Sequence, residues 1–332
     1  MPTRRRDQGG VAATQVVVPA ANLPQAPVPS KGPQNWAHRA LYDRVISTLF
    51  ALPERFETTL RIEGVPAPDL FTMNSALGAA IEKSVVDSLN ELRSMWDPQQ
   101  QYADYSFVRQ SQRFPDVLLR TSNPNPQHPA IILGLELKGW FVLSKEGEPS
   151  FRYKISPQCC AEADLLVVLP WIFDSVVSGK PRLLDPIITE AAYAAKRRNY
   201  HWEWLRSNPN GEAQGRRGIT AASHSGTYPP KSAKSSDVPL SDSGGNFGRV
   251  ARCGAIDADV DARLAAEILG IPADSWRRFL LVFADGATPT VMADGLSGLA
   301  RLLDTAGLTA AQRENAADLL QQLSWLLRGR ET

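Results

Sequence analysis

The stretch AIILGLELKGWFVL, residues 130–143, constrains the fold more than any other part of this chain of 332 residues. It is almost continuously apolar, which is typical of a strand that is covered on its faces. Glu136 and Lys138 nevertheless stand in its middle. Because a buried charge is costly unless it is paired or binds a metal, the stretch predicts further charged groups close by.

The alternation of side chains along a strand divides this stretch into two faces. Glu136 and Lys138 share one face with Ile132 and Gly134, whereas the odd positions, mainly leucines, form the other. We expect the apolar face to pack against a helix. On the polar face, Gly134 is expected to leave room for another group to approach the sheet.

The rest of the first 206 residues predicts helices alternating with strands. One helix, residues 74–96, carries Asn74 or Ser75 as its N-cap. Its inward-facing stripe consists of Leu77, Ile81, Val85, Leu89 and Leu92. The other predicted elements are a helix at 36–53, strands at 105–120, 130–143, 150–155 and 164–171, one or two helical turns at 156–163, and a long helix at 186–206. This order predicts an α/β fold with a small mixed sheet flanked by helices.

The composition divides the chain into four regions. A stretch of more than forty residues rich in Gly, Ser and Pro is unusual inside a compact domain, and it is expected to be functional or disordered. The last region predicts helices at its start and end, and residues 275–284 fit either a strand or a helix. The four regions are a disordered tail at 1–34, a core at 35–206, a loop or linker at 207–252, and a mostly helical region at 253–332.

Composition and charge exclude several classes of protein. The formal net charge is +1, so any affinity for nucleic acid must come from local patches. No apolar run approaches the length needed to cross a membrane. The first residues resemble a signal peptide only loosely, because Gln15 and several prolines interrupt the apolar part. The odd, sparse set of 3 cysteines suits a reducing compartment, so we expect a cytoplasmic protein.

Asp116, in the segment RFPDVLLR, is the expected partner of Glu136 and Lys138. The turn-rich segment TSNPNPQHPA lies between the two predicted strands, so a hairpin would bring Asp116 and Glu136 together. Two adjacent carboxylates repel each other, and a divalent cation between them removes that conflict. Oxygen ligands favour a hard ion such as Mg²⁺. Lys138 could then orient a water molecule or neutralise charge on a phosphate, which points to a phosphodiester substrate.

Pro115-Asp116 followed by Glu136-Leu137-Lys138 resembles the signature of the PD-(D/E)xK nuclease superfamily, to which many restriction endonucleases belong. Lys138 is the only lysine of the chain with an acidic residue two positions before it. The resemblance covers roughly residues 74–205. It implies a restriction-endonuclease-like core in which Asp116 and Glu136 bind Mg²⁺, with Mn²⁺ as a substitute, and in which Lys138 assists the attacking water. An acidic residue on the preceding helix often joins such a site, and Glu82 matches that position.

The resemblance implies a Mg²⁺-dependent DNA endonuclease of the restriction or phage-defence kind. Such enzymes commonly act on double-stranded DNA as homodimers, and the C-terminal helices could supply the dimer interface. Two alternatives stay open from the sequence. The protein could be an inactive binding module in which Asp116, Glu136 and Lys138 form only a buried ion-pair network. It could also be a nuclease that acts on RNA or on repair intermediates.

Further polar residues are candidates for contact with DNA. Gln112 and Arg113 precede the proposed site, and both residue types suit base edges. A basic run beside aromatic residues suits either phosphate contact or a solvated helix face. That run consists of Lys196, Arg197 and Arg198, followed by Tyr200, Trp202 and Trp204. Gln158 is implied by the resemblance, because some related nucleases place a polar residue near the site at this point. The basic residues of 207–252, which include Lys231 and Lys234, could close over DNA, or the segment could be a spacer.

Overall fold

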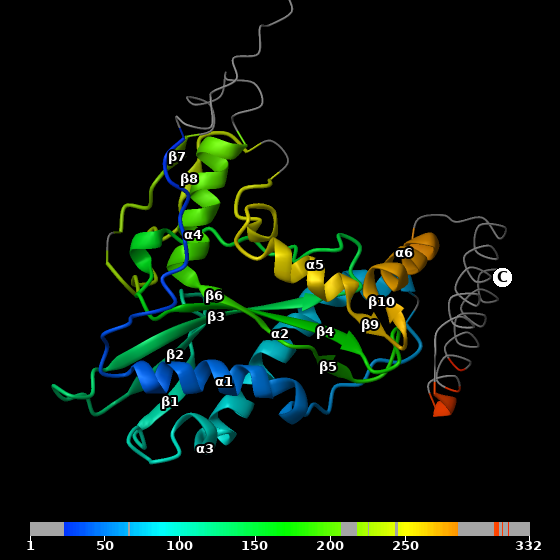
Figure 1. The fold of residues 1–332 in the computed structure, drawn as a ribbon, viewed down its shortest axis with the longest axis horizontal. Coiled ribbons are helices and arrows are strands. Elements are labelled where there is room, and N and C mark those ends of the chain that lie inside the picture. The colour runs from blue at the N-terminus through cyan, green and yellow to red at the C-terminus, as the bar shows by residue number, and fades with distance from the viewer. Residues whose placement is uncertain are drawn as a thin grey trace, which may run out of the picture.

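The computed structural model describes residues 23–65, 67–206, 218–224, 226–242, 245–284, 309–311, 314 and 318. A 6-stranded mixed sheet lies at its centre, and helices cover both faces of the sheet (Figure 1). The strands are β1 (Tyr105–Arg109), β2 (Val117–Thr121), β3 (Ile131–Phe141), β4 (Leu165–Phe173), β5 (Pro181–Leu183) and β6 (Ile187–Glu190). The prediction of an α/β fold with a small mixed sheet is confirmed at this level.

The sheet is antiparallel at both ends and parallel at its centre. Its strand order is β1-β2-β3-β4-β5, and β6 pairs with β4 beside β5. Strands β1, β2 and β3 are antiparallel neighbours, whereas β3 and β4 run parallel. Every residue of β4 is buried, as its continuous apolar run predicts. Strand β3 is buried over most of its length. Glu136 and Lys138 lie within the part of β3 that pairs with β4, opposite Leu166 and Val168.

The strand-like stretch 105–120 forms the two strands β1 and β2, because the chain turns back at Gln112, whose φ is 53°, and at Pro115, which has no N–H for a ladder. The prediction of a strand at 150–155 is wrong. Residues 151–154 form no strand. Their backbone instead bonds to irregular chain from much later in the sequence: Tyr153 N–H donates to the Gly248 carbonyl, and Asp237 N–H donates to the Lys154 carbonyl.

Helices α1 (Arg39–Arg55), α2 (Ala67–Glu91) and α3 (Arg93–Trp96) pack together beside the sheet (Figure 1). Helix α2 begins seven residues before the predicted start at Asn74, so Asn74 and Ser75 lie inside the helix and are not caps. Pro68 is accommodated because the first helical turn does not need its N–H. The predicted inward stripe is confirmed, with Leu77, Ile81, Val85 and Leu89 buried and Leu92 partly buried.

Helix α2 lies against the odd-numbered face of β3, as predicted for the apolar face. The contact is closest at two glycines, where a Cβ added to Gly139 would lie 2.9 Å from the Cα of Gly78. The absence of side chains at both positions lets the two backbones approach each other. This approach fixes the height of α2 over β3, and it places Glu82, one turn after Gly78, beside the end of the Glu136–Lys138 segment.

The predicted helix at 186–206 begins later than expected. Residues Ile187–Glu190 form strand β6 on the edge of β4, which suits the β-branched side chains of Ile187, Ile188 and Thr189. Helix α4 (Ala191–Tyr200) follows and continues into a π-helical turn at His201–Leu205. Figure 1 shows α4 on the side of the sheet opposite α1 and α3.

Two regions in which the sequence predicted no helix or strand are held by hydrogen bonds. In the predicted tail, the N–H groups of Ser30 and Gly32 donate to the Glu190 carboxylate at 2.8 and 2.6 Å, so the prediction of disorder is wrong for these residues. Residues 1–22 lie outside the described residues. In the Gly/Ser/Pro-rich region, β7 (Ile219–Thr220) pairs with β8 (Val238–Pro239), and a short 3-10 helix spans Val250–Arg252.

The described part of the C-terminal region is mostly helical. It contains α5 (Asp257–Ala265), a small pair of strands, β9 (Glu267–Ile268) and β10 (Ile271–Pro272), and α6 (Ala273–Ala284). The stretch 275–284 is therefore a helix, and α6 packs against both α5 and α2. The predicted last helix lies almost wholly outside the described residues, and so does the dimer interface that it could supply.

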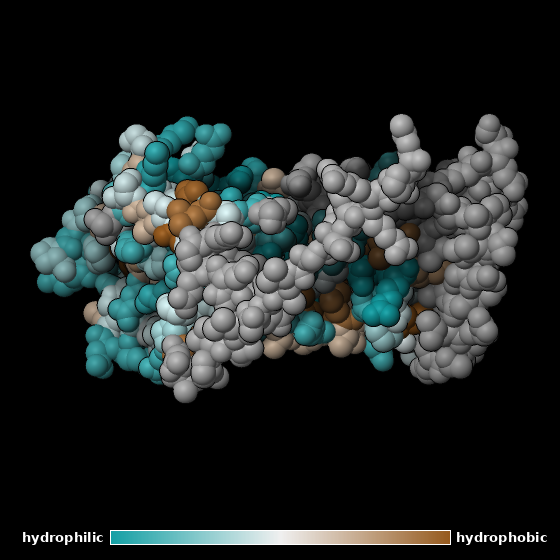
Figure 2. All heavy atoms as spheres, turned by 90° about the horizontal axis from the view of Figure 1, so that it is seen from above, coloured by the Kyte–Doolittle hydropathy of each residue, from teal (hydrophilic) through white to brown (hydrophobic). Residues whose placement is uncertain are grey.

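One face of the described surface is mainly hydrophilic, and the three cysteines form no disulfide among the described residues. Seen from above the view of Figure 1, the described surface is mainly hydrophilic, with hydrophobic residues in small patches (Figure 2). Cys159, Cys160 and Cys253 are buried and free. Among the described residues, no helix combines the length and the apolar character that crossing a membrane requires.

Candidate active site

The register of the β2–β3 hairpin brings Asp116 to Glu136. Val117 pairs with Leu135, so one further step along the antiparallel ladder places Asp116 opposite Glu136. The Asp116 N–H donates to Glu136 Oε2 at 3.2 Å, and the Leu137 N–H donates to Asp116 Oδ2 at 3.1 Å. The predicted hairpin contact between the two carboxylates is confirmed.

The ammonium group of Lys138 joins the two carboxylates. Its Nζ lies 2.9 Å from Asp116 Oδ2 and 2.9 Å from Glu136 Oε1. Glu136 and Lys138 share one face of β3, as their spacing predicts, and Asp116 reaches the same point from the start of β2. One cation therefore serves two anions, and we call these three residues the DEK cluster.

Burial and neighbouring charges shift the pKa values of Glu136 and Lys138 in the DEK cluster. Burial of Glu136 raises the pKa of its carboxyl to about 7; Lys138 opposes this shift and Asp116 adds to it. Burial alone would lower the pKa of Lys138, but Glu136 and Asp116 outweigh it and raise that pKa. A carboxyl whose pKa lies near neutrality, beside a second carboxylate, is a group that binds either a proton or a further cation.

Glu82 lies beside the DEK cluster without joining its hydrogen bonds. Its Oε1 accepts a hydrogen bond from the Gly139 N–H at 3.1 Å. Burial raises the pKa of Glu82, whereas that hydrogen bond and Lys138 lower it. Among the described residues, no group of three or more His, Cys, Asp or Glu side chains is arranged to hold a metal ion. A three-carboxylate ligand set is thus not assembled in this conformation.

The donor chemistry of the DEK cluster fits a hard divalent cation. Asp116 and Glu136 offer only oxygen ligands, which Mg²⁺ and Mn²⁺ accept. The two carboxylates already share one cationic group at equal distances. Their pairing with a single ammonium leaves one negative charge uncompensated when both are ionised. Two residues, Asp116 and Glu136, therefore supply the oxygen ligands that fit a divalent cation. Glu82 lies near enough for Lys138 and Asp116 to shift its pKa.

Asp116 and Glu136 of the DEK cluster form part of the wall of a cavity of about 260 Å³. Gln112 and Arg113 are exposed at this cavity, so the structure brings both predicted residues to the site. The opposite wall comes from a loop more than ninety residues later, which we call the 229–235 loop. The lining residues are Gln112, Arg113, Phe114, Asp116, Glu136, Ile155, Pro229, Pro230, Lys231, Ala233 and Ser235.

The space expected beside Gly134 is filled by the protein itself. A Cβ added at Gly134 would collide with the ring of Pro115 and would lie 2.9 Å from Asp164 Oδ1. The Gly134 N–H also donates to Asp164 Oδ1 at 2.7 Å. The group that approaches the sheet at Gly134 is therefore the ring of Pro115, and this close packing against β3 sets the position of Asp116.

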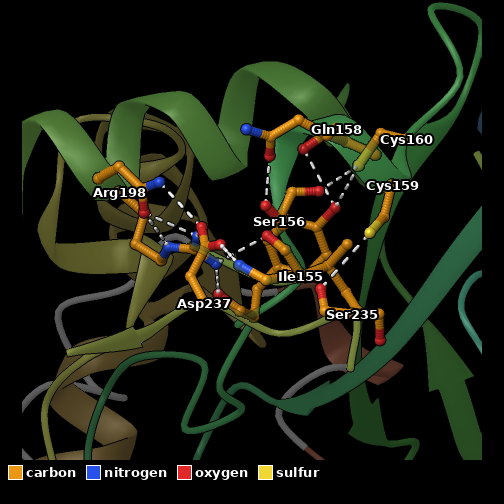
Figure 3. Close-up of polar contacts among 12 residues, drawn as sticks. Ile155, Ser156, Gln158, Cys159, Cys160, Arg198, Ser235 and Asp237 are labelled. Carbon is orange, nitrogen blue, oxygen red and sulfur yellow. Dashed lines mark hydrogen bonds and ion pairs between the residues drawn. The ribbon is translucent and has the colours of Figure 1, made fainter. Parts of the chain in front are cut away.

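The prediction that Arg198 contacts DNA is wrong, because this side chain is buried inside the protein. Its side chain is 2% exposed and forms an ion pair with Asp237 at 2.6 Å. It also donates to the carbonyl oxygens of Tyr153 and Ile155 at 2.7 and 3.0 Å (Figure 3). The bonds from Arg198 to Asp237, Tyr153 and Ile155 hold distant segments of the chain together.

The other predicted contacts with DNA lie away from the cavity lining. Lys196 is exposed, and Arg197 is partly buried with its guanidinium 5.4 Å from the ring centre of Tyr200. Gln158 is exposed, and its amide oxygen accepts a hydrogen bond from the Ser156 hydroxyl (Figure 3). None of these three residues lines the cavity that holds the DEK cluster. Their contact with DNA stays a prediction.

The sequence indicated Lys231 and Lys234 as possible contacts with DNA, but it did not predict that the 229–235 loop lines the cavity. The loop has no periodic pattern, and its position depends on hydrogen bonds to residues far away in the chain. The one available signal was its pair of lysines in a Pro-rich turn, which does not reveal what they face.

Comparison with protein-family models, with curated proteins and with solved structures found no match to this chain. A function for the protein therefore rests on the chemistry of the site.

Proposed function

We propose that this protein is a metal-dependent nuclease that hydrolyses phosphodiester bonds in DNA. The observation that carries the proposal is the pairing of Lys138 with Asp116 and Glu136, two carboxylates that line one cavity of about 260 Å³. A phosphodiester needs a water nucleophile and neutralisation of the charge that develops on phosphorus oxygens. Two carboxylates beside one lysine supply groups for both tasks.

The roles follow from the chemistry of each side chain. Asp116 and Glu136 would hold Mg²⁺ or Mn²⁺, which when bound would lower the pKa of water and polarise the phosphate. Lys138 would orient the attacking water or stabilise the charge of the transition state. The water oxygen forms a bond to phosphorus and one P–O ester bond breaks, so the products are a phosphomonoester and a hydroxyl group. Glu82 would serve as a third ligand or hold a water molecule.

The finer assignment follows from the resemblance to the PD-(D/E)xK superfamily. On that basis we propose an endonuclease of the restriction or phage-defence kind, which acts on double-stranded DNA as a homodimer. Substrates that contain RNA or repair intermediates would use the same cluster. Parallel assays on duplex DNA, single-stranded DNA and RNA would separate these possibilities.

A second candidate function is a binding protein that retains a nuclease-like core. It is favoured by the double pairing of Lys138, which already compensates part of the charge on both carboxylates. A calorimetric titration with Mn²⁺ separates the two candidates. The nuclease requires heat of binding that Asp116→Asn removes, whereas the binding protein requires none.

The direct test is cleavage of plasmid DNA in the presence of Mg²⁺. We expect Asp116→Asn and Lys138→Ala to lower the rate by about 10²–10³-fold, the usual cost of losing one group that stabilises transition-state charge. Lys234→Ala is the matched control, because Lys234 is exposed and does not line the cavity. Equal cleavage by the wild type and both site variants, or cleavage that EDTA does not diminish, would exclude the proposed site.

A further inference from the structure

The 229–235 loop is fixed to the core at its first end. Just before it, the Tyr228 hydroxyl donates to Asp164 Oδ1 at 2.8 Å, and the Tyr228 N–H donates to the Cys159 carbonyl at 3.2 Å. Asp164 also accepts from the Gly134 N–H in β3. The start of the loop is thus connected to the strand that carries Glu136 and Lys138.

The other end of the loop is fixed more strongly. The Ser156 N–H donates to the Ser235 carbonyl at 2.9 Å. Two residues on, Asp237 pairs with Arg198 at 2.6 Å and accepts from Asn199 Nδ2 at 2.9 Å. Figure 3 shows Arg198, Asp237 and Ser235 converging on the backbone around Ile155 and Ser156. The 229–235 loop is therefore a fixed wall of the cavity and not a spacer.

Two cationic side chains at the cavity lack acidic partners. Lys231 is exposed on the 229–235 loop, and Arg113 is exposed on the turn between β1 and β2. Among the described residues, no carboxylate lies within ion-pair distance of either. Lys138 differs from them, since it contacts two carboxylates. Lys231 and Arg113 therefore direct uncompensated positive charge toward the cavity that the DEK cluster faces.

We propose that Lys231 is a phosphate-binding residue that holds the substrate backbone over the DEK cluster, with Arg113 as a second phosphate contact. The inference rests on the proposed nuclease function, because it names the group that receives the phosphodiester at the same site. The Arg198–Asp237 pair is a positioning element, since it fixes the loop that carries Lys231. Duplex and single-stranded DNA present the same phosphodiester, so the experiment compares them.

The experiment measures binding of labelled duplex and single-stranded oligonucleotides by fluorescence anisotropy in EDTA, so that hydrolysis is not needed. We expect Lys231→Ala to weaken binding about ten-fold, the usual range for a hydrogen bond to a charged group. Lys231→Arg should retain most of the affinity. Lys234→Ala should bind as the wild type does, because Lys234 carries the same charge on the same loop without lining the cavity.

The salt dependence separates a phosphate contact from a structural effect. Loss of one phosphate contact lowers the magnitude of the negative slope of log K against log salt by about 0.9 for duplex and about 0.7 for single strands. A purely structural change weakens binding without that signature. The strand form with the larger loss for Lys231→Ala is the one that the cavity receives.

Three outcomes are distinguishable. Equal affinities and slopes for Lys231→Ala and Lys234→Ala would overturn the role of Lys231, while cleavage abolished by Asp116→Asn would still support the nuclease. Reduced affinity and slope in Lys231→Ala alone would support the inference, even if no substrate is cleaved under the chosen conditions. Wild-type protein that neither binds nor cleaves any of the nucleic acids would overturn both proposals.

Discussion

Two of the buried or partly buried clusters of acidic and basic side chains among the described residues differ in charge balance. In the first, Arg198 and Asp237 form one cation paired with one anion, with side chains 2% and 0% exposed. Arg198 uses its further donors on the carbonyl oxygens of Tyr153 and Ile155 and on the Asn199 side chain. Burial lowers the pKa of Arg198, and Asp237 opposes that shift.

The DEK cluster has one cation for two anions and borders a cavity. Its side chains are 21%, 31% and 10% exposed for Lys138, Asp116 and Glu136. The pKa of Glu136 is raised, mainly by burial. The comparison shows how to separate structure from function at a buried ion pair. A neutral, saturated pair serves to hold segments together, whereas a cluster left with excess charge beside open space retains the capacity to bind a ligand.

The first prediction breaks the balanced pair. Arg198→Met leaves the Asp237 carboxylate buried without a cation, and removal of one partner of a buried pair costs about 3–5 kcal/mol. Lys138→Met should cost less, because its cluster is partly exposed and Glu136 can take up a proton instead. Urea unfolding at pH 7, followed by tryptophan fluorescence, measures both free energies.

The double variant Arg198→Met/Asp237→Leu is the control for this prediction. It removes both charges, so it should recover much of the stability that Arg198→Met loses. A double variant as unstable as the single variant would show that packing of the Arg198 side chain, and not its charge, stabilises the fold. Equal losses for Arg198→Met and Lys138→Met would remove the distinction between the two clusters.

The two clusters also differ in how far the sequence predicts them. Asp116, Glu136 and Lys138 follow from local rules: strand alternation places Glu136 and Lys138 on one face, and a hairpin turn returns the chain to Asp116. Arg198 looks like part of a surface basic run, because its partner Asp237 lies 39 residues later in a segment without any period. Long-range pairing of this kind leaves no trace in a local pattern.

The same limit explains the misplaced element boundaries. Residues 187–190 have β-branched side chains that suit a strand, but only the free edge of β4 decides between strand and helix. The sequence predicted room beside Gly134 but not the group that would occupy it, which in the structure is the ring of Pro115. The position of Lys231 in the cavity wall could not be predicted, because it depends on the hydrogen bond that Tyr228 donates to Asp164 and on the one that Asp237 accepts from Asn199.

The second prediction sharpens the comparison through pH. The pKa of Glu136 rises from its ordinary 4.5 to about 7 in the folded protein, so the folded state binds more protons than the unfolded state between these values. The free energy of unfolding should therefore fall as the pH rises through this range. The loss attributable to Glu136 is on the order of 1–3 kcal/mol. Urea unfolding in EDTA at several pH values measures it.

Glu136→Gln isolates this effect. Asp164, whose pKa burial raises from 3.8 to about 6, produces a loss of the same sign at lower pH and remains in the variant. The variant should therefore lose stability less steeply than the wild type as the pH approaches 7. Parallel curves for variant and wild type would mean that Glu136 ionises without difficulty, and the excess charge of the DEK cluster would then have no energetic consequence.

The third prediction has the smallest effect and asks where the DEK cluster ends. Glu82→Gln keeps an oxygen that can accept from the Gly139 N–H, so the free energy of unfolding should change by less than about 0.5 kcal/mol. Plasmid cleavage should fall about ten-fold, the lower range for loss of a group that supports metal binding. Glu82→Ala separates charge from contact, since it also removes the hydrogen bond and should lower stability further. Unchanged cleavage by Glu82→Gln would place Glu82 among the structural residues, with Asp237, because only its contact with the backbone would then matter.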